Sequence, residues 1–116
     1  MKDITCTDDF IAAKDTLRHN FILFLRNFAD GPQSDYDRKQ YFTDAIYALN
    51  HPEMRLDFYD LLSGKVPYAV YQTALEIHFE EKGEQRGKPY PAGHAGHYAR
   101  CFLLLRNYLR EQGLIG

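Results

Sequence analysis

Apolar residues recur every three or four positions along most of this chain, and the densest run is residues 98–109 (YARCFLLLRNYL). Helical spacing places six residues of this run on one broad face: Tyr98, Cys101, Phe102, Leu105, Tyr108 and Leu109. Leu103 and Leu104 lie outside that face, so the helix is apolar around more than half of its circumference. We therefore expect a helix over about residues 92–112 that is either central in a bundle or partly covered by a second chain.

The same periodicity predicts two helices in the first half of the chain. The first has Thr7 as its N-cap, is about 22 residues long, and stops at residues 30–32 (DGP), where glycine and proline end helices. The second follows Ser34, which forms a capping pattern with Asp37 three residues later. It ends at residues 50–52 (NHP), because the residue before a proline avoids helical geometry.

Two further helices are predicted between these and the last one. A short helix runs from Pro52 to the stop at residues 63–65 (SGK). Another begins at Pro67, since proline fits the first helical turn. The polar, glycine-containing residues 81–88 (EKGEQRGK) are expected to form a loop.

No segment shows the strict alternation of a β-strand, so we predict an all-α protein. We expect a compact bundle of four to five helices forming a single domain over residues 1–116. The sequence shows neither a signal peptide nor an apolar run long enough to span a bilayer, which predicts a cytoplasmic protein with no membrane partner. Cys101 is expected to be a buried free thiol rather than the disulfide partner of Cys6.

Candidate binding chemistry is concentrated in residues 86–110, which hold five arginine or lysine residues, two histidines and no acid. The helix N-terminus after Pro91, with glycines at positions 93 and 96, fits phosphate or carboxylate binding. A wider basic strip with Tyr90 for base stacking fits nucleic acid. The alternative is an ordinary connection whose charges keep it solvated. The candidate binding residues, for a protein interface or for an anion, are Arg86, Lys88, Tyr90, His94, His97, Arg100, Leu103, Leu104, Arg106 and Arg110.

A metal site is a weaker candidate in the same segment. His94, His97 and Cys101 follow i, i+3, i+7 spacing, which a helix places along one side, and His78 is a conceivable fourth ligand. However, Cys101 lies among apolar residues and no Cys-x-x-Cys pair is present. We therefore favour a core cysteine with solvent-facing histidines, and we predict no cofactor.

Catalytic motifs are absent from the sequence: it contains no nucleophile elbow, metalloprotease motif or phosphate-binding loop, and Glu76 and Glu80 fit a solvated helix face. Nine tyrosines, eight phenylalanines and the very apolar last helix are traits of interaction surfaces. The charge is also uneven, because residues 1–60 carry seven basic and eleven acidic groups whereas residues 61–116 carry seven and five.

These features predict a small regulatory binding protein, such as an accessory subunit, an inhibitor, an immunity protein or an antitoxin. Its partner would be another protein or a second copy of itself. The alternative is a nucleic-acid- or phosphate-binding protein that uses residues 86–110, and a metal-dependent enzyme ranks third.

Overall fold

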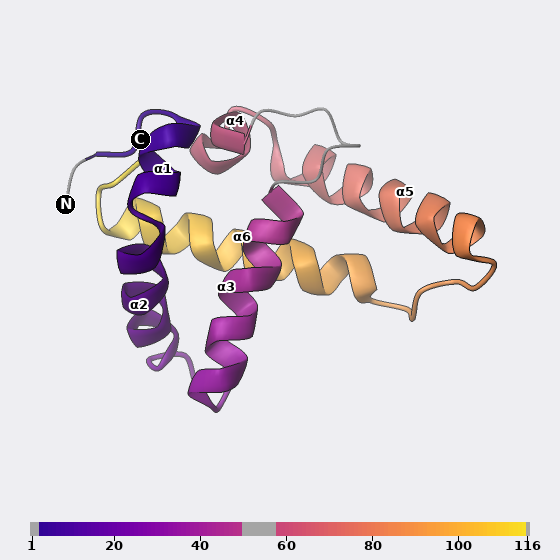
Figure 1. Cartoon of the computed structure of the whole chain (residues 1–116), viewed down its shortest axis with the longest axis horizontal. Helices are drawn as coiled ribbons and strands as arrows, with labels where there is room; N and C mark the ends of the chain where they lie inside the picture. Colours follow the sequence, from indigo (N-terminus) through magenta and orange to yellow (C-terminus); the bar gives the residue numbers. More distant parts are fainter. Residues whose placement is uncertain (1–2, 50–57, 116) are drawn as a thin grey trace.

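The computed structural model describes residues 3–49 and 58–115, and all regular secondary structure in these ranges is helical (Figure 1). The predicted all-α class is therefore confirmed. The helices are α1 (Thr7–Ala12), α2 (Lys14–Leu25), α3 (Asp35–Leu49), α4 (Phe58–Ser63), α5 (Tyr68–Arg86) and α6 (His94–Glu111). The described ranges thus hold six helices rather than four or five. Within these residues, no helix has the length and apolar character needed to cross a membrane.

The additional helix arises because the first predicted helix is divided at Ala13. This residue ends α1 and precedes α2, with a backbone (φ −95°, ψ 2°) outside regular helical geometry. The predicted N-cap is also wrong by one residue, since the extended Cys6 is the N-cap and Thr7 is the first residue of α1. The Asp9 carboxylate secures this start by accepting hydrogen bonds from the Thr5 N–H (3.0 Å) and the Thr5 hydroxyl (2.8 Å).

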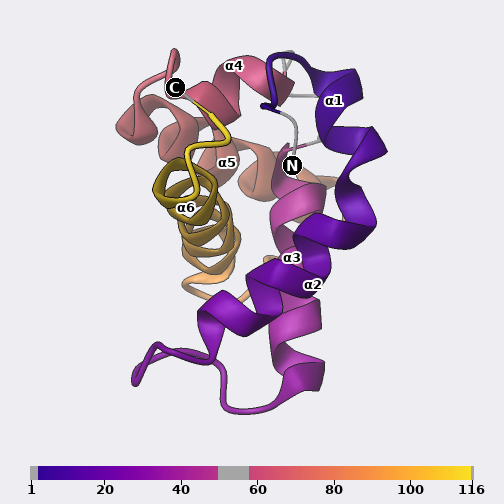
Figure 2. The same ribbon diagram turned by 90° about the vertical axis from the view of Figure 1, so that its left-hand side faces the viewer.

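Helices α2 and α3 form an antiparallel pair (Figures 1 and 2). Ser34 caps α3 as predicted, because its hydroxyl accepts a hydrogen bond from the Asp37 N–H (3.1 Å). Asp35 links the start of α3 to Arg26 at the end of α2, and it also pairs with Arg38 within α3. The Arg26 hydrogen bond is the main cause that lowers the Asp35 pKa to about 2. The predicted boundary between the second and third helices, at residues 50–52, lies outside the described residues.

Helix α6 is the central helix, because α2, α3 and α5 all pack against it (Figure 2). Its buried residues occupy most of its circumference: Ala99, Cys101, Phe102, Leu104, Leu105, Arg106, Tyr108 and Leu109. The sequence predicted that this helix is either central in a bundle or partly covered by a second chain. Within the described residues, α6 has the central position. The two ends of the chain meet nearby, where the Ile4 N–H donates to the Leu114 carbonyl (2.8 Å).

Helix α5 runs antiparallel to α6 and is longer than predicted (Figure 1). It continues to Arg86, so the prediction of a loop from residue 81 is wrong up to that point. The helix stops at Gly87, whose positive φ of 72° suits a left-handed cap. Two hydrogen bonds complete this cap, from the Gly87 N–H to the Glu84 carbonyl (3.1 Å) and from the Lys88 N–H to the Gly83 carbonyl (3.0 Å).

Candidate functional site

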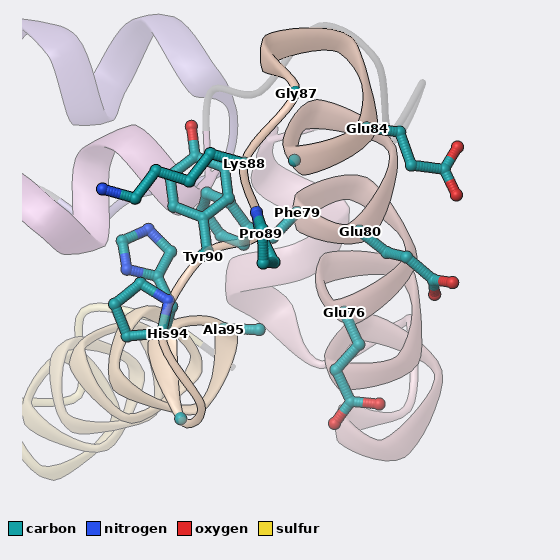
Figure 3. Close-up of a pocket in the computed structure, with 13 residues that line it drawn as sticks. Glu76, Phe79, Glu80, Glu84, Gly87, Lys88, Pro89, Tyr90, His94 and Ala95 are labelled. Atoms are coloured by element: carbon teal, nitrogen blue, oxygen red, sulfur yellow. The ribbon is translucent and has the colours of Figure 1, made fainter.

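A groove of about 480 Å³ lies between the second half of α5 and the connection from α5 to α6 (Figure 3). This volume falls within the range of natural ligand pockets. We call it the α5–α6 groove, and its lining residues are Glu76, Phe79, Glu80, Gly83, Glu84, Gly87, Lys88, Pro89, Tyr90, Pro91, Gly93, His94 and Ala95.

One wall of the groove is aromatic. The His94 ring stacks on Tyr90 (centroids 4.6 Å apart) and meets the Phe79 ring edge to face at 4.4 Å. The Arg86 guanidinium lies over the Tyr90 ring at 4.0 Å, and its Nε–H donates to the Lys88 carbonyl (2.8 Å). Burial lowers the His94 pKa, and the nearby His97 and Arg86 lower it further, which favours the neutral imidazole. The wall therefore presents uncharged rings to the groove.

The opposite rim is acidic. Glu76, Glu80 and Glu84 recur every fourth residue on α5, and all three are exposed. Their carboxylates project from α5 on the side away from Tyr90 and His94, whereas the Lys88 ammonium points the other way (Figure 3). Within residues 3–49 and 58–115, none of the three glutamates forms an ion pair. They therefore form a row of exposed negative charge beside the aromatic wall.

The arginines and lysine of residues 86–110 do not form one strip. Arg86 and Lys88 lie at the groove, and Arg100 is exposed on α6. Arg106 is only 8% exposed, and its guanidinium sits 5.3 Å from the centroid of the Phe102 ring. The Arg110 guanidinium donates to the last carbonyl of α4 (3.2 Å). Three of the five cations, Arg86, Arg106 and Arg110, thus contact other groups of the fold.

The chain itself covers Leu104, and it covers Leu103 only in part. Leu103 is half-buried and Leu104 is 8% exposed, because α2, α3 and α5 cover most but not all of the surface of α6. Exposed apolar side chains lie at several other places in the described residues, among them Ile11 on α1 (59% exposed) and Val70 and Ile77 on α5 (54% and 50% exposed). Val70 and Ile77 are seven positions apart and share one helix face.

A second group of polar side chains joins α3 to α6. The Asp44 Oδ2 atom lies 2.8 Å from His97 Nε2, and the Cys101 Sγ atom lies 3.7 Å from the same nitrogen. The three donor atoms all lie within 4.8 Å of one another. The Gln40 side-chain amide donates to the other Asp44 oxygen, Oδ1 (3.1 Å). We call these three residues the Asp44–His97–Cys101 cluster.

The sequence predicted only part of this cluster. His97 and Cys101 do come together, but the His94 ring belongs to the groove wall, and His78 is buried on α5 against the Phe79 ring. Asp44 was not predicted, because nothing in the local pattern of α3 connects it to a histidine 53 residues away. Its only distinguishing feature is burial among the apolar residues of α3, which the structure reveals.

The cluster does not have the arrangement of a nucleophilic catalyst. Burial, followed by the Asp44 charge, raises the Cys101 pKa to about 12, so the free thiol stays protonated. A Cys-His-Asp relay needs the acid and the thiol on different imidazole nitrogens. Here both approach Nε2. Instead, the cluster brings together three atoms that can each bind a metal ion: a carboxylate oxygen, an imidazole nitrogen and a sulfur.

Comparison with family models, curated proteins and solved structures finds no match for this chain. The fold and the groove define an all-helical protein with a ligand-sized groove beside its central helix. Function is therefore inferred from the chemistry of the groove and of the cluster.

Proposed function

We propose that this protein is a small binding protein that takes an extended basic segment of another protein into the α5–α6 groove. The observation that carries the proposal is the combination, in one groove of about 480 Å³, of an aromatic wall and a row of exposed glutamates. The wall favours apolar side chains, because their burial against rings removes apolar surface from water. The glutamates favour lysine or arginine.

The spacing of the glutamates suits an extended partner. Residues four apart on a helix are about 6 Å apart along its axis. Residues two apart on an extended chain are separated by about 6.6 Å. A segment lying along α5 can therefore direct alternate basic side chains at Glu76, Glu80 and Glu84, and the intervening side chains at the aromatic wall.

The surroundings of α5 support the same function. Within the described residues this helix packs chiefly against α6, and its Val70 and Ile77 side chains are exposed outside the groove. Exposed apolar side chains beside a polar rim are common at protein interfaces. By contrast, the glutamates would repel the phosphates of a nucleic acid, and the burial of Arg106 removes one of the cations that nucleic-acid binding would use.

The proposal is tested with two fluorescein-labelled peptides, Gly-Lys-Phe-Lys-Leu-Lys-Gly and its counterpart with glutamate in place of each lysine. Fluorescence polarisation measures affinity, and NMR amide shifts locate the peptide. The basic peptide is expected to bind, to shift the amides of residues 87–95, and to weaken as salt is added. The acidic peptide, which has the same apolar content, is expected not to bind.

Charge variants provide the matched controls. Each exposed ion pair contributes ~0.2–1 kcal/mol, so replacing Glu76, Glu80 and Glu84 together by Gln should weaken binding roughly threefold to hundredfold. Glu81→Gln removes an equally exposed charge of α5 that does not line the groove, and it should leave the affinity unchanged. Equal binding of both peptides, or equal effects of the triple and the Glu81 variants, would exclude recognition by this groove.

A further inference from the structure

We propose that Asp44, His97 and Cys101 form a binding site for a divalent transition-metal ion of the zinc class. The inference is independent of the proposed peptide groove, because it rests on side chains that α3 and α6 bring together. These residues supply one carboxylate oxygen, one imidazole nitrogen and one sulfur, all within 4.8 Å of one another.

The two distances from His97 Nε2 to the other donor atoms are near those of a tetrahedral site, and the Asp44 oxygen and the Cys101 sulfur lie within 4.8 Å of each other. With usual bond lengths to zinc, a nitrogen and a sulfur ligand lie about 3.6 Å apart, and a nitrogen and an oxygen ligand about 3.4 Å apart. The cluster has 3.7 Å for His97 Nε2 to Cys101 Sγ and 2.8 Å for His97 Nε2 to Asp44 Oδ2. A metal ion therefore enters after the imidazole and the carboxylate separate by about half an ångström, which small side-chain rotations supply.

Neighbouring side chains hold two of the ligands in position. Gln40 donates to Asp44 Oδ1, which leaves Oδ2 directed at His97. The Tyr41 and Tyr98 rings meet the His97 ring edge to face, at 5.4 and 5.5 Å. Such supporting contacts fix the orientation of metal ligands and strengthen binding.

The mixture of donors selects the metal. Calcium and magnesium take oxygen ligands, whereas imidazole with thiolate suits zinc and related ions. Three protein ligands leave a fourth position, and the His97 side chain, 41% exposed, opens the cluster to a water ligand on that side. On binding, the metal–sulfur bond replaces the S–H bond of Cys101, and the thiol proton passes to solvent.

The test titrates cobalt(II) into chelator-treated, tag-free protein and records the absorption spectrum. A thiolate-bound cobalt ion gives an intense near-ultraviolet charge-transfer band, and zinc should displace it at one ion per chain. The band is expected in Cys6→Ser and His94→Gln, which alter the other cysteine and the neighbouring histidine. The band should be lost in Cys101→Ala. His97→Gln should weaken the affinity for cobalt(II) by at least about a hundredfold.

Gln40→Ala tests the supporting contact and alters only an exposed side chain. It should keep the band and weaken cobalt affinity by about tenfold to a hundredfold. Circular dichroism of each metal-free variant establishes that it is folded. The absence of a band in the unaltered protein, a band that depends on Cys6 rather than on Cys101, or undiminished affinity in folded His97→Gln would each overturn the site.

Discussion

The substitution Gly83→Ala, which adds one methyl group, tests the contact between Gly83 and the chain that follows α5. Gly83 is buried within α5, where the connection to α6 folds back against it. A Cβ atom at this position would lie 3.2 Å from the Pro89 Cα, 3.4 Å from the Lys88 carbonyl oxygen and 3.6 Å from the Tyr90 nitrogen. All three are backbone atoms, which cannot rotate away as the end of a side chain would.

Two effects of opposite sign determine the outcome of Gly83→Ala. Alanine is favoured over glycine inside a helix by ~1 kcal/mol. Overpacking a well-filled site costs ~1–3 kcal/mol, and the Lys88 N–H hydrogen bond to the Gly83 carbonyl limits how far the loop can retreat. We therefore expect Gly83→Ala to lower the free energy of unfolding by between zero and ~2 kcal/mol.

Gly96→Ala is the matched control, because this glycine also lies in a helix but a Cβ there would meet nothing within 4 Å. It gains up to ~1 kcal/mol of helix propensity with no packing penalty. The two variants should differ by ~1–3 kcal/mol, or by roughly 4–12 °C in melting temperature. Urea and thermal unfolding followed by far-ultraviolet circular dichroism measure both quantities.

The reasoning is refuted if Gly83→Ala stabilises the protein as much as Gly96→Ala does. That result would mean that the loop carrying Pro89 and Tyr90 is not held against α5. The groove wall would then lack the fixed position that selective binding requires.

Further predictions concern the cysteines, the core and the acid range. Iodoacetamide should label Cys6 in the native metal-free protein and spare Cys101, which is buried with its pKa raised to about 12; equal labelling by peptide mass spectrometry would contradict this. Phe102→Ala should cost about 3–5 kcal/mol of stability in urea unfolding, clearly more than Leu103→Ala at its half-buried neighbour, and equal losses would contradict the burial of α6. The Asp35 pKa is lowered to about 2, so its carboxylate stabilises the fold fully above its ordinary value of 3.8 and loses this effect as the pH falls through about 2. Asp35→Asn should therefore flatten the fall in stability between about pH 4 and pH 2, and parallel pH curves for both proteins would refute this.

Much of the helical architecture follows from the sequence, because helix formation and its end signals are local. The recurrence of apolar residues identified the helices, Ser34 capped α3 as expected, and the all-α class is confirmed. Two of the predicted helix boundaries are wrong. Gly83 indicated the end of a helix, but α5 continues through this residue. The glycine leaves room for the chain that follows α5, which approaches so closely that a Cβ atom would be crowded there. Nothing in the apolar pattern indicated the interruption at Ala13.

The positions of the functional side chains depend on how the helices cross, and no local pattern encodes that. Helical spacing placed His94, His97 and Cys101 on one side of α6, yet the His94 ring lies among Phe79 and Tyr90 while His97 meets Asp44 from α3. The sequence thus determined which segments are helical and which faces are apolar, because backbone hydrogen bonds and periodic burial act over a few residues. Only the tertiary structure decided which polar groups converge and which apolar surface stays exposed, because those outcomes depend on contacts between helices far apart in the chain.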